Sequence, residues 1–443
     1  MRASSEQVTR TYFLLAGLYT LAASIIWGVN TLFLLDAGLG IGEVFVANAG
    51  YSIGTVLFEI PTGVIADTLG RRVSFLSSIA ILMLTTVLYV WLARAGLGIG
   101  PFFVTSVLMG LGFTFYSGAM EAWLVDALDA TGFSGELDPV FARGQQITGA
   151  AMLVGTVGGG LLGQIDLSLP YLSRALILGL VFVLALARMR DIGFRPRRVP
   201  VRELPGTMRS AAAAGVRFGW NNRSLRGLMI AGGIQMGFFS WAWYAWQPYL
   251  LELLDRDLVW VSGVVSALLA LSMIGGNQLV DVLSRRCGFR TTLLLWSGVV
   301  FSLAGVVVGI TSSFWIALPF LCLMMATVGV TSPTRQAFLH ETVASGQRAT
   351  VVSFDSLVAG VGGAAAQPAL GAVAADRGYG PGFLLGSALT LVAVPVLWTV
   401  RRRHAPADRF RAGDCAVEPT QRPHGLPRIA SIDPKAGTAA TSS

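Results

Sequence analysis

Long apolar runs, separated by short polar segments, dominate this chain. The first run, from Tyr12 to Leu35, has about the 20 residues that a helix needs to cross a bilayer. Barrel strands would be about half as long, and lipid offers no partner to an unpaired backbone group, so only helices suit runs of this length. The pattern predicts twelve membrane-spanning helices, over residues 11–35, 43–66, 73–94, 100–127, 143–165, 169–188, 225–251, 258–281, 290–310, 314–340, 349–374 and 380–400.

The composition agrees with a protein embedded in lipid. Hydrophobic residues make up 54% of the chain and charged residues 13%, whereas a soluble domain carries about 25% charged residues. The net charge of +8 comes from arginine, because Lys435 is the only lysine. This charge lies in the gaps between apolar runs and not on one folded face, so we expect a lipid bilayer as partner and no nucleic acid.

The distribution of arginine predicts the orientation in the membrane. Most arginines fall in one set of alternating segments: 67–72, 128–143, 188–226, 281–290, 341–348 and 401–403. The opposite segments hold Arg94, Arg174, Arg256 and Arg377. The positive-inside rule places the arginine-rich side in the cytoplasm. With an even number of spans, both termini are then expected to be cytoplasmic, in a multi-pass protein of the cell membrane.

The spacing of the runs predicts two bundles. Residues 1–10 form an N-terminal tail, and 11–188 hold six spans. Residues 189–224 form a central cytoplasmic loop, rich in arginine and proline, that we expect to lie on anionic headgroups. Residues 225–400 hold the other six spans, and the polar tail 401–443 is expected to be disordered.

A charged hexapeptide occurs once in each half. Asp67-Thr68-Leu69-Gly70-Arg71-Arg72 and Asp281-Val282-Leu283-Ser284-Arg285-Arg286 share the pattern Asp-x-Leu-x-Arg-Arg, each between two apolar runs. The stretches 117–124 and 332–339 also correspond, and Asp126 then matches Glu341. An ordered set of matches indicates an internal duplication. We therefore expect two pseudo-symmetric six-helix bundles.

The first hexapeptide belongs to a longer motif. Gly63-Val64-Ile65-Ala66-Asp67-Thr68-Leu69-Gly70-Arg71-Arg72 resembles the hinge Gly-x-Leu-Ala-Asp-Arg-x-Gly-Arg-[Arg/Lys] between the second and third helices of the major facilitator superfamily, and departs from it at Ile65 and Thr68. In the second copy, Asn277 and Ser284 stand where glycines would be. The resemblance covers residues 11–400. It implies an all-α integral membrane protein of the major facilitator fold, whose halves rock around a central site for a small molecule, without a cofactor.

Two further stretches resemble bacterial drug-efflux members of that superfamily. They are Phe58-Glu59-Ile60-Pro61-Thr62-Gly63 and Glu121-Ala122-Trp123-Leu124-Val125-Asp126. The antiporter motif Gly-Pro-x-x-Gly-Gly is matched by Gly155-Thr156-Val157-Gly158-Gly159-Gly160, with Thr156 in place of proline. The resemblance implies proton-coupled efflux of a small, partly apolar compound such as a drug. An importer or symporter of a metabolite from the same superfamily is the alternative.

The hinge is expected to act as a gate. Asp67 lies at a helix end beside arginines, and the resemblance implies that it contacts the start of the eleventh helix, near Arg348, in one transport state only. The alternative is a simple positive anchor at the membrane surface. The predicted gating residues are Gly63, Asp67, Gly70, Arg71 and Arg72, with Asp126 at the end of the fourth helix and Asp281, Arg285 and Arg286 in the second half.

Three ionisable residues within the spans are candidates for proton coupling or substrate binding: Glu59, Glu121 and Arg335. Charge within a membrane is costly and therefore indicates function, although snorkelling to the interface would also place them there. Glu121 and Arg335 occupy near-equivalent positions in the two halves, so they could pair across the cavity, or Glu59 could take the arginine. Asn30 and Gln235 are the candidate polar residues of the cavity.

Other functional classes find little support. A membrane enzyme would need a catalytic or metal-binding set, and the chain shows none. A sensor would need a large soluble domain, for which the tail is too short. Cys287, Cys322 and Cys415 have neither zinc-site spacing nor the pattern of a disulfide framework. We therefore expect a monomeric transporter that binds no metal.

Overall fold

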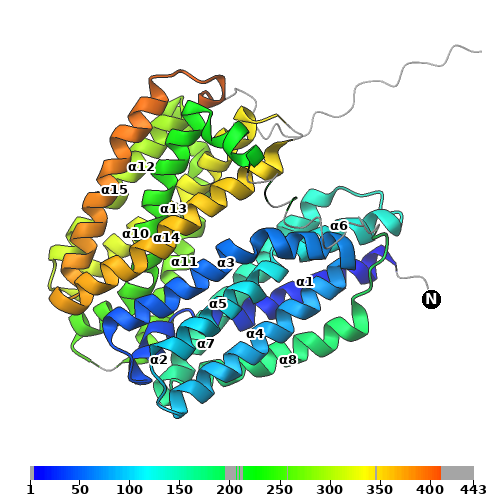
Figure 1. Ribbon diagram of the computed structural model, residues 1–443, viewed down its shortest axis with the longest axis horizontal. Helices are drawn as coiled ribbons and strands as arrows, with labels where there is room; N and C mark the ends of the chain where they lie inside the picture. The colour runs from blue at the N-terminus through cyan, green and yellow to red at the C-terminus, as the bar shows by residue number, and fades with distance from the viewer. Residues whose placement is uncertain are drawn as a thin grey trace, which may run out of the picture.

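The computed structural model describes residues 4–194, 213–256, 258–344 and 347–410, together with Gly206 and Arg209. Much of the predicted central loop and the predicted tail beyond 410 lie outside these residues. Helices make up nearly all of the described chain, and Figure 1 shows them in two bundles, one from each half of the sequence.

The first half begins with a broken helix. Its helices are α1 (Ser5–Ser24), α2 (Asn30–Asp36), α3 (Ile41–Leu69), α4 (Arg71–Arg94), α5 (Ile99–Tyr116), α6 (Ala119–Ala130), α7 (Leu137–Ile165) and α8 (Leu169–Arg188). Together α1 and α2 cover the first predicted span, with an irregular turn between them. Likewise α5 and α6 cover the fourth, divided at Gly118, whose φ of 74° is left-handed.

In the second half, each predicted span corresponds to one helix. After η2 (Gly215–Trp220) come α10 (Arg223–Leu254), α11 (Val259–Cys287), α12 (Arg290–Ile310), α13 (Phe314–Thr342), α14 (Arg348–Arg377), α15 (Tyr379–Arg401) and the short η4 (Pro406–Asp408). In the described chain, 10 helical stretches are long and apolar enough to cross a membrane. The two other predicted spans are the broken pair α1–α2 and α10, which is rich in glycine, tryptophan and tyrosine.

Each half has its own apolar core. Phe33, Phe75 and Tyr171 lie in the core of the first half, and Phe238 and Phe383 lie in that of the second. Other large apolar side chains point outward, among them Leu176, Ile310 and Trp315. Outward-facing apolar side chains are what a lipid-exposed surface requires.

The two bundles pack along α3 with α14 and along α7 with α11. Glycines bring α7 and α11 close together, since a Cβ on Gly160 would lie 2.7 Å from the Cα of Gly263. Small residues at a helix crossing allow this approach in membranes. Within the glycine-rich stretch of the predicted fifth span, Gly160 therefore serves the contact between the halves, whereas Gly155 and Gly159 approach the end of α1 in the same half.

The halves meet at the end of the molecule that carries α2 (Figure 1). There the Gln247 side chain accepts a hydrogen bond from the Thr31 backbone N at 2.9 Å and donates one to the Trp27 carbonyl at 2.8 Å. Toward the arginine-rich end the bundles diverge. A Cβ on Gly63 would meet no described atom within 4 Å. The structure is therefore closed at the arginine-poor end.

Candidate functional site

The turn between α3 and α4 gathers the predicted gating residues of the first half. Gly70 has a φ of 113°, which reverses the chain between Leu69 and the start of α4. Arg71 Nη1 lies 2.8 Å from Asp67 Oδ1, and Arg71 Nε lies 3.9 Å from Asp126 Oδ2. The structure thus brings Asp67, Arg71 and Asp126 together as the sequence predicts. Their role in gating stays a prediction.

Arg72 is held by the last turn of α8 and by the segment that follows it. Its backbone N donates to Asp191 Oδ1 at 2.8 Å, and its Nη2 donates to the Leu186 carbonyl at 2.8 Å. Asp191 therefore caps the first turn of α4 from a distant part of the chain. Burial raises the pKa of the Asp191 carboxyl, and the hydrogen bond from Arg72 N opposes this shift. A Cβ on Gly70 would clash with Asp191, so glycine is required there.

In the second half, the turn between α11 and α12 comes later in the chain than the repeat predicts. Helix α11 continues to Cys287, so Asp281 lies more than a turn before its end, whereas Asp67 is two residues from the end of α3. Asp281 is exposed and forms no ion pair with a described residue. Arg285 and Arg286 are also exposed, on the last turn of the helix. The reversal occurs instead at Gly288, with a φ of 65°.

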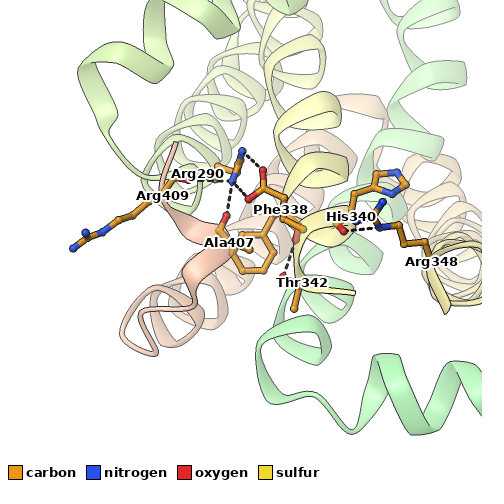
Figure 2. A network of polar contacts seen from close by, with 8 residues as sticks. Arg290, Phe338, His340, Thr342, Arg348, Ala407 and Arg409 are labelled. Atoms are coloured by element: carbon orange, nitrogen blue, oxygen red, sulfur yellow. Dashed lines mark hydrogen bonds and ion pairs between the residues drawn. The ribbon is translucent and has the colours of Figure 1, made fainter. Parts of the chain in front are cut away.

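Arg290, the first residue of α12, takes the place that Arg71 has in the first half. Its Nη2 lies 2.7 Å from Glu341 Oε1, and its Nη1 donates to Glu341 Oε2 at 3.0 Å. Figure 2 shows the same guanidinium donating to the Ala407 carbonyl, at 2.6 Å. Glu341 thus occupies the place of Asp126, as the sequence alignment of the halves predicts. The repeat does not identify Arg290, because α11 continues further past its motif aspartate than α3 does.

Residues 405–410, which we call the C-terminal strap, pack against this turn. The Asp408 carboxylate accepts from the Thr291 backbone N at 2.8 Å and from Thr291 Oγ1 at 2.7 Å. Asp408 therefore caps α12 as Asp191 caps α4. The Phe410 backbone N donates to the Gly288 carbonyl at 3.4 Å. This part of the predicted disordered tail is ordered, because it supplies partners to a helix N-terminus and to a buried arginine.

Arg335 of α13 has a partner that sequence analysis overlooks. Its guanidinium forms two hydrogen bonds with the carboxylate of Asp355 on α14, one of them from Nη1 to Oδ2 at 2.6 Å. Asp355 is only 7% exposed. The expected pairing of Arg335 with Glu121 or Glu59 is therefore absent from this structure, where Glu59 is half-buried and Glu121 is exposed. A lone carboxylate within an apolar run is the signal that would have identified Asp355.

A cavity of about 190 Å³ lies beside this pair, within the second bundle. Arg335 and the predicted polar residue Gln235 both line it, together with Thr327, Thr331 and Ser332. A Cβ on Gly232 would clash with the Arg335 guanidinium, so this glycine makes room for the charged group. Polar and apolar side chains share the wall, which suits a compound of mixed character.

Asn30, the other predicted polar residue, hydrogen-bonds within the first half. Its Nδ2 donates to Asn48 Oδ1 at 2.9 Å, and its Oδ1 accepts from the Tyr171 hydroxyl at 2.8 Å. This network lies at the break between α1 and α2. In the part of the chain that the structure describes, no group of three or more His, Cys, Asp or Glu residues is placed to hold a metal ion.

Comparison with known proteins identifies distant relatives. The chain is 26% identical over 369 residues to "Tetracycline resistance protein, class C" of Escherichia coli, a match that covers 78% of this chain and 84% of that protein. It is 27% identical over 362 residues to the class G protein of Vibrio anguillarum, covering 78% and 85%. Both matches span most of the two bundles.

Solved structures share the fold. The nucleoside transporter NupG superposes with a TM-score of 0.74 at 11% identity, over 89% of this chain and 99% of that one. An auto-inhibited peptide transporter of the POT family gives 0.70 at 16% identity, over 92% and 98%. The model of the Major Facilitator Superfamily matches residues 12–286 and 261–414. The chain therefore belongs to the major facilitator superfamily, and it is a multi-pass membrane transporter and not an enzyme.

Proposed function

We propose that this protein exports a small, partly apolar compound across the cell membrane in exchange for protons. The observation that carries the proposal is the buried Arg335–Asp355 pair beside a cavity of mixed polarity. The relatives named as tetracycline resistance proteins support efflux as the direction of transport. The chain supplies no nucleotide-binding motif, so an ion gradient is the energy source that we propose.

The ion pair offers a way to couple protons to transport. A nearby buried guanidinium favours the charged form of a carboxylate. Protonation of the carboxylate would leave the positive charge of the arginine uncompensated. Protonation of Asp355 from one side of the membrane would release Arg335. When the halves rock and water reaches the pair from the opposite side, the proton would leave Asp355 on that side. Glu59 and Glu121 remain candidates for the same role. At 1.5 Å per residue, Glu59 lies roughly 12 Å along α3 from Asp67.

The proposed orientation follows the arginines, with both termini and the central loop in the cytoplasm. The closed end then faces outward, and the structure represents an inward-facing conformation. In this conformation Asp67 pairs with Arg71 of its own turn. We propose that it contacts the start of α14, near Arg348, when the cytoplasmic ends of the bundles come together.

The test is transport in proteoliposomes under an imposed pH gradient, with a substrate panel that includes tetracycline. We expect at least one of Glu59→Gln, Glu121→Gln and Asp355→Asn to lose uphill export and keep exchange of labelled substrate across the membrane. Because Asp355→Asn leaves Arg335 unpaired, the double variant with Arg335→Gln checks that a loss of transport is not a loss of folding.

The matched control is Asp376→Asn, which removes a carboxylate at the exposed end of the same helix, α14. This variant is expected to export at the wild-type rate. If all three carboxylate variants still drive uphill export at the wild-type rate, the proposed coupling residues are wrong. If the wild type moves substrate only with the proton gradient and not against it, the symporter alternative replaces the exporter.

A further inference from the structure

Arg174 is a buried cation that has no counter-ion among the described residues. It lies near the arginine-poor end of the predicted span 169–188, and the structure places it inside α8 with only 8% of its surface exposed. It forms neither an ion pair nor a hydrogen bond with any described residue. Its Nε is completely buried without a partner. This group therefore needs an explanation that the proposed coupling and gating residues do not supply.

Tyrosines surround Arg174 where a carboxylate would be expected. The groups that act electrostatically on it are the phenols of Tyr19, Tyr51, Tyr89 and Tyr171, and no described Asp or Glu is among them. Tyr244, on α10 of the other half, also lies within its electrostatic range. Five helices, α1, α3, α4, α8 and α10, thus place a phenol near one guanidinium.

Some of these phenols already have partners and others do not. Tyr89 hydrogen-bonds with Ser106, and the Tyr171 hydroxyl donates to Asn30 Oδ1. The hydroxyls of Tyr19, Tyr51 and Tyr244 form no hydrogen bond with a described residue, and they are not among the atoms that are sealed completely from solvent. The same is true of the terminal nitrogens of Arg174. These donors therefore border space that solvent can reach.

The energetics favour an anion in that space. A buried and uncompensated charge costs several kcal/mol, and a guanidinium carries five donors in a geometry that matches a carboxylate. The phenols are neutral at pH 7 and therefore do not balance the charge of the guanidinium. An incoming anionic group would supply the missing counter-ion and accept hydrogen bonds from the neighbouring hydroxyls.

We propose that Arg174 binds a carboxylate, or a comparable anionic group, of the transported compound. This inference rests on the proposed function and narrows its substrate class to compounds that join an anionic group to an aromatic or apolar body. The aromatic walls suit such a body, since Tyr19 and Tyr116 stack with ring centroids 3.6 Å apart. Tyr244 adds a donor from the second half, and its carbonyl accepts from Thr31 Oγ1 at 2.9 Å. A ligand here would therefore touch both halves at the closed end.

The test measures ligand-induced thermal stabilisation of the purified full-length protein in a chloride-free buffer. The probes are benzoate, salicylate and 1-naphthoate, each compared with its uncharged methyl ester. We expect the acids to raise the melting temperature of the wild type and the esters to have little effect. Arg174→Gln should raise the acid concentration that gives half of this shift by about tenfold or more. Arg174→Lys should keep part of the affinity because it keeps the charge.

Arg188→Gln is the matched control, because Arg188 is exposed at the other end of the same helix and its loss changes the net charge equally. It should leave the response to the acids unchanged. Without ligand, Arg174→Gln should melt at the same temperature as the wild type or higher, since it removes an uncompensated charge. A purely structural arginine would instead give a lower melting temperature.

The inference is overturned if Arg174→Gln responds to the acids as strongly as the wild type, or if the wild type does not distinguish the acids from their esters. It is also overturned if chloride alone produces the full stabilisation. The proposed function is tested separately: if Arg174→Gln still exports a neutral compound uphill under a pH gradient, the exporter stands whatever becomes of the anion site. If the wild type shows no gradient-driven transport, the proposed export function is rejected, but the binding of the acids measured in detergent is unaffected.

Discussion

The two halves build the same turn from the same types of residue, yet the two turns differ in burial. In the first half, the ion pair of Arg71 with Asp67 leaves their side chains 20% and 47% exposed, and the second partner, Asp126, is 3.9 Å away. In the second half, Arg290 is 3% exposed and makes two short bonds to Glu341. The C-terminal strap covers this second turn, and Asp191 caps the first turn through the backbone N of Arg72.

This difference indicates different roles. The half-buried pair of Asp67 and Arg71 should contribute less than a buried pair, closer to the value of about 0–1 kcal/mol for typical surface pairs, so Asp67 can exchange its partner at a smaller cost. Removing one partner of a buried pair costs about 3–5 kcal/mol. The first turn is therefore suited to change its contacts during transport, and the second is suited to hold α11, α12 and α13 in a fixed arrangement.

The largest expected effect is on the buried pair. Arg290→Gln should destabilise the folded protein by about 3–5 kcal/mol, because it leaves the Glu341 carboxylate without its guanidinium. Arg71→Gln should cost about 1 kcal/mol or less. Melting temperature and the monodisperse fraction in detergent measure both. Equal melting of the two variants would remove the distinction between the turns.

Truncation tests the C-terminal strap. A chain ending after His404 loses the Asp408 cap on α12 and the carbonyl contacts to Arg290, so we expect about 1–3 kcal/mol of destabilisation. A chain ending after Phe410 keeps these contacts and should melt at a higher temperature than the shorter chain. The comparison of the two truncations in the same thermal assay is the control. If both behave alike, the strap contributes nothing to the second half.

The gating prediction concerns transport and not stability. Asp67→Asn should reduce the transport rate several-fold while insertion and melting temperature stay near wild type, because a half-buried pair at the membrane surface adds little to folding. Asp281→Asn should have the smaller effect, since Asp281 lies away from the turn and without an ion pair among the described residues. Full activity of Asp67→Asn in proteoliposomes would contradict a gating role.

The smallest expected effect is that of the single-cysteine variants that test the orientation, which should not change activity. Single cysteines in the central loop and in both tails, placed in a background without native cysteines, should resist a membrane-impermeant thiol reagent in intact cells. A cysteine at Arg256, between α10 and α11, should react and serves as the positive control. Labelling of the central loop from outside would reverse the topology.

Local signals in the sequence were enough to predict most of the architecture. Apolar length predicts the spans, and the hinge motif predicts the meeting of Asp67, Arg71 and Asp126. The roles of Asp191, Asp408 and Arg290 could not be predicted, because each depends on a segment folding back onto a turn more than a hundred residues away. Asp355 and Arg174 were visible as charges near apolar runs, but their surroundings come from helices that are distant in sequence.

The central claim is that transport requires the closed end of this structure to open, and one pair of residues tests it directly. A Cβ on Gly42, at the start of α3, would lie 3.7 Å from the Cβ of Ala375, near the end of α14. This separation is close to the mean of about 3.8 Å in disulfides. With Cys287, Cys322 and Cys415 replaced, the variant Gly42→Cys/Ala375→Cys should form a disulfide under oxidation and stop transport, and reduction should restore it. If the fully cross-linked protein transports as fast as the same variant with free thiols, the result would contradict alternating access at this end.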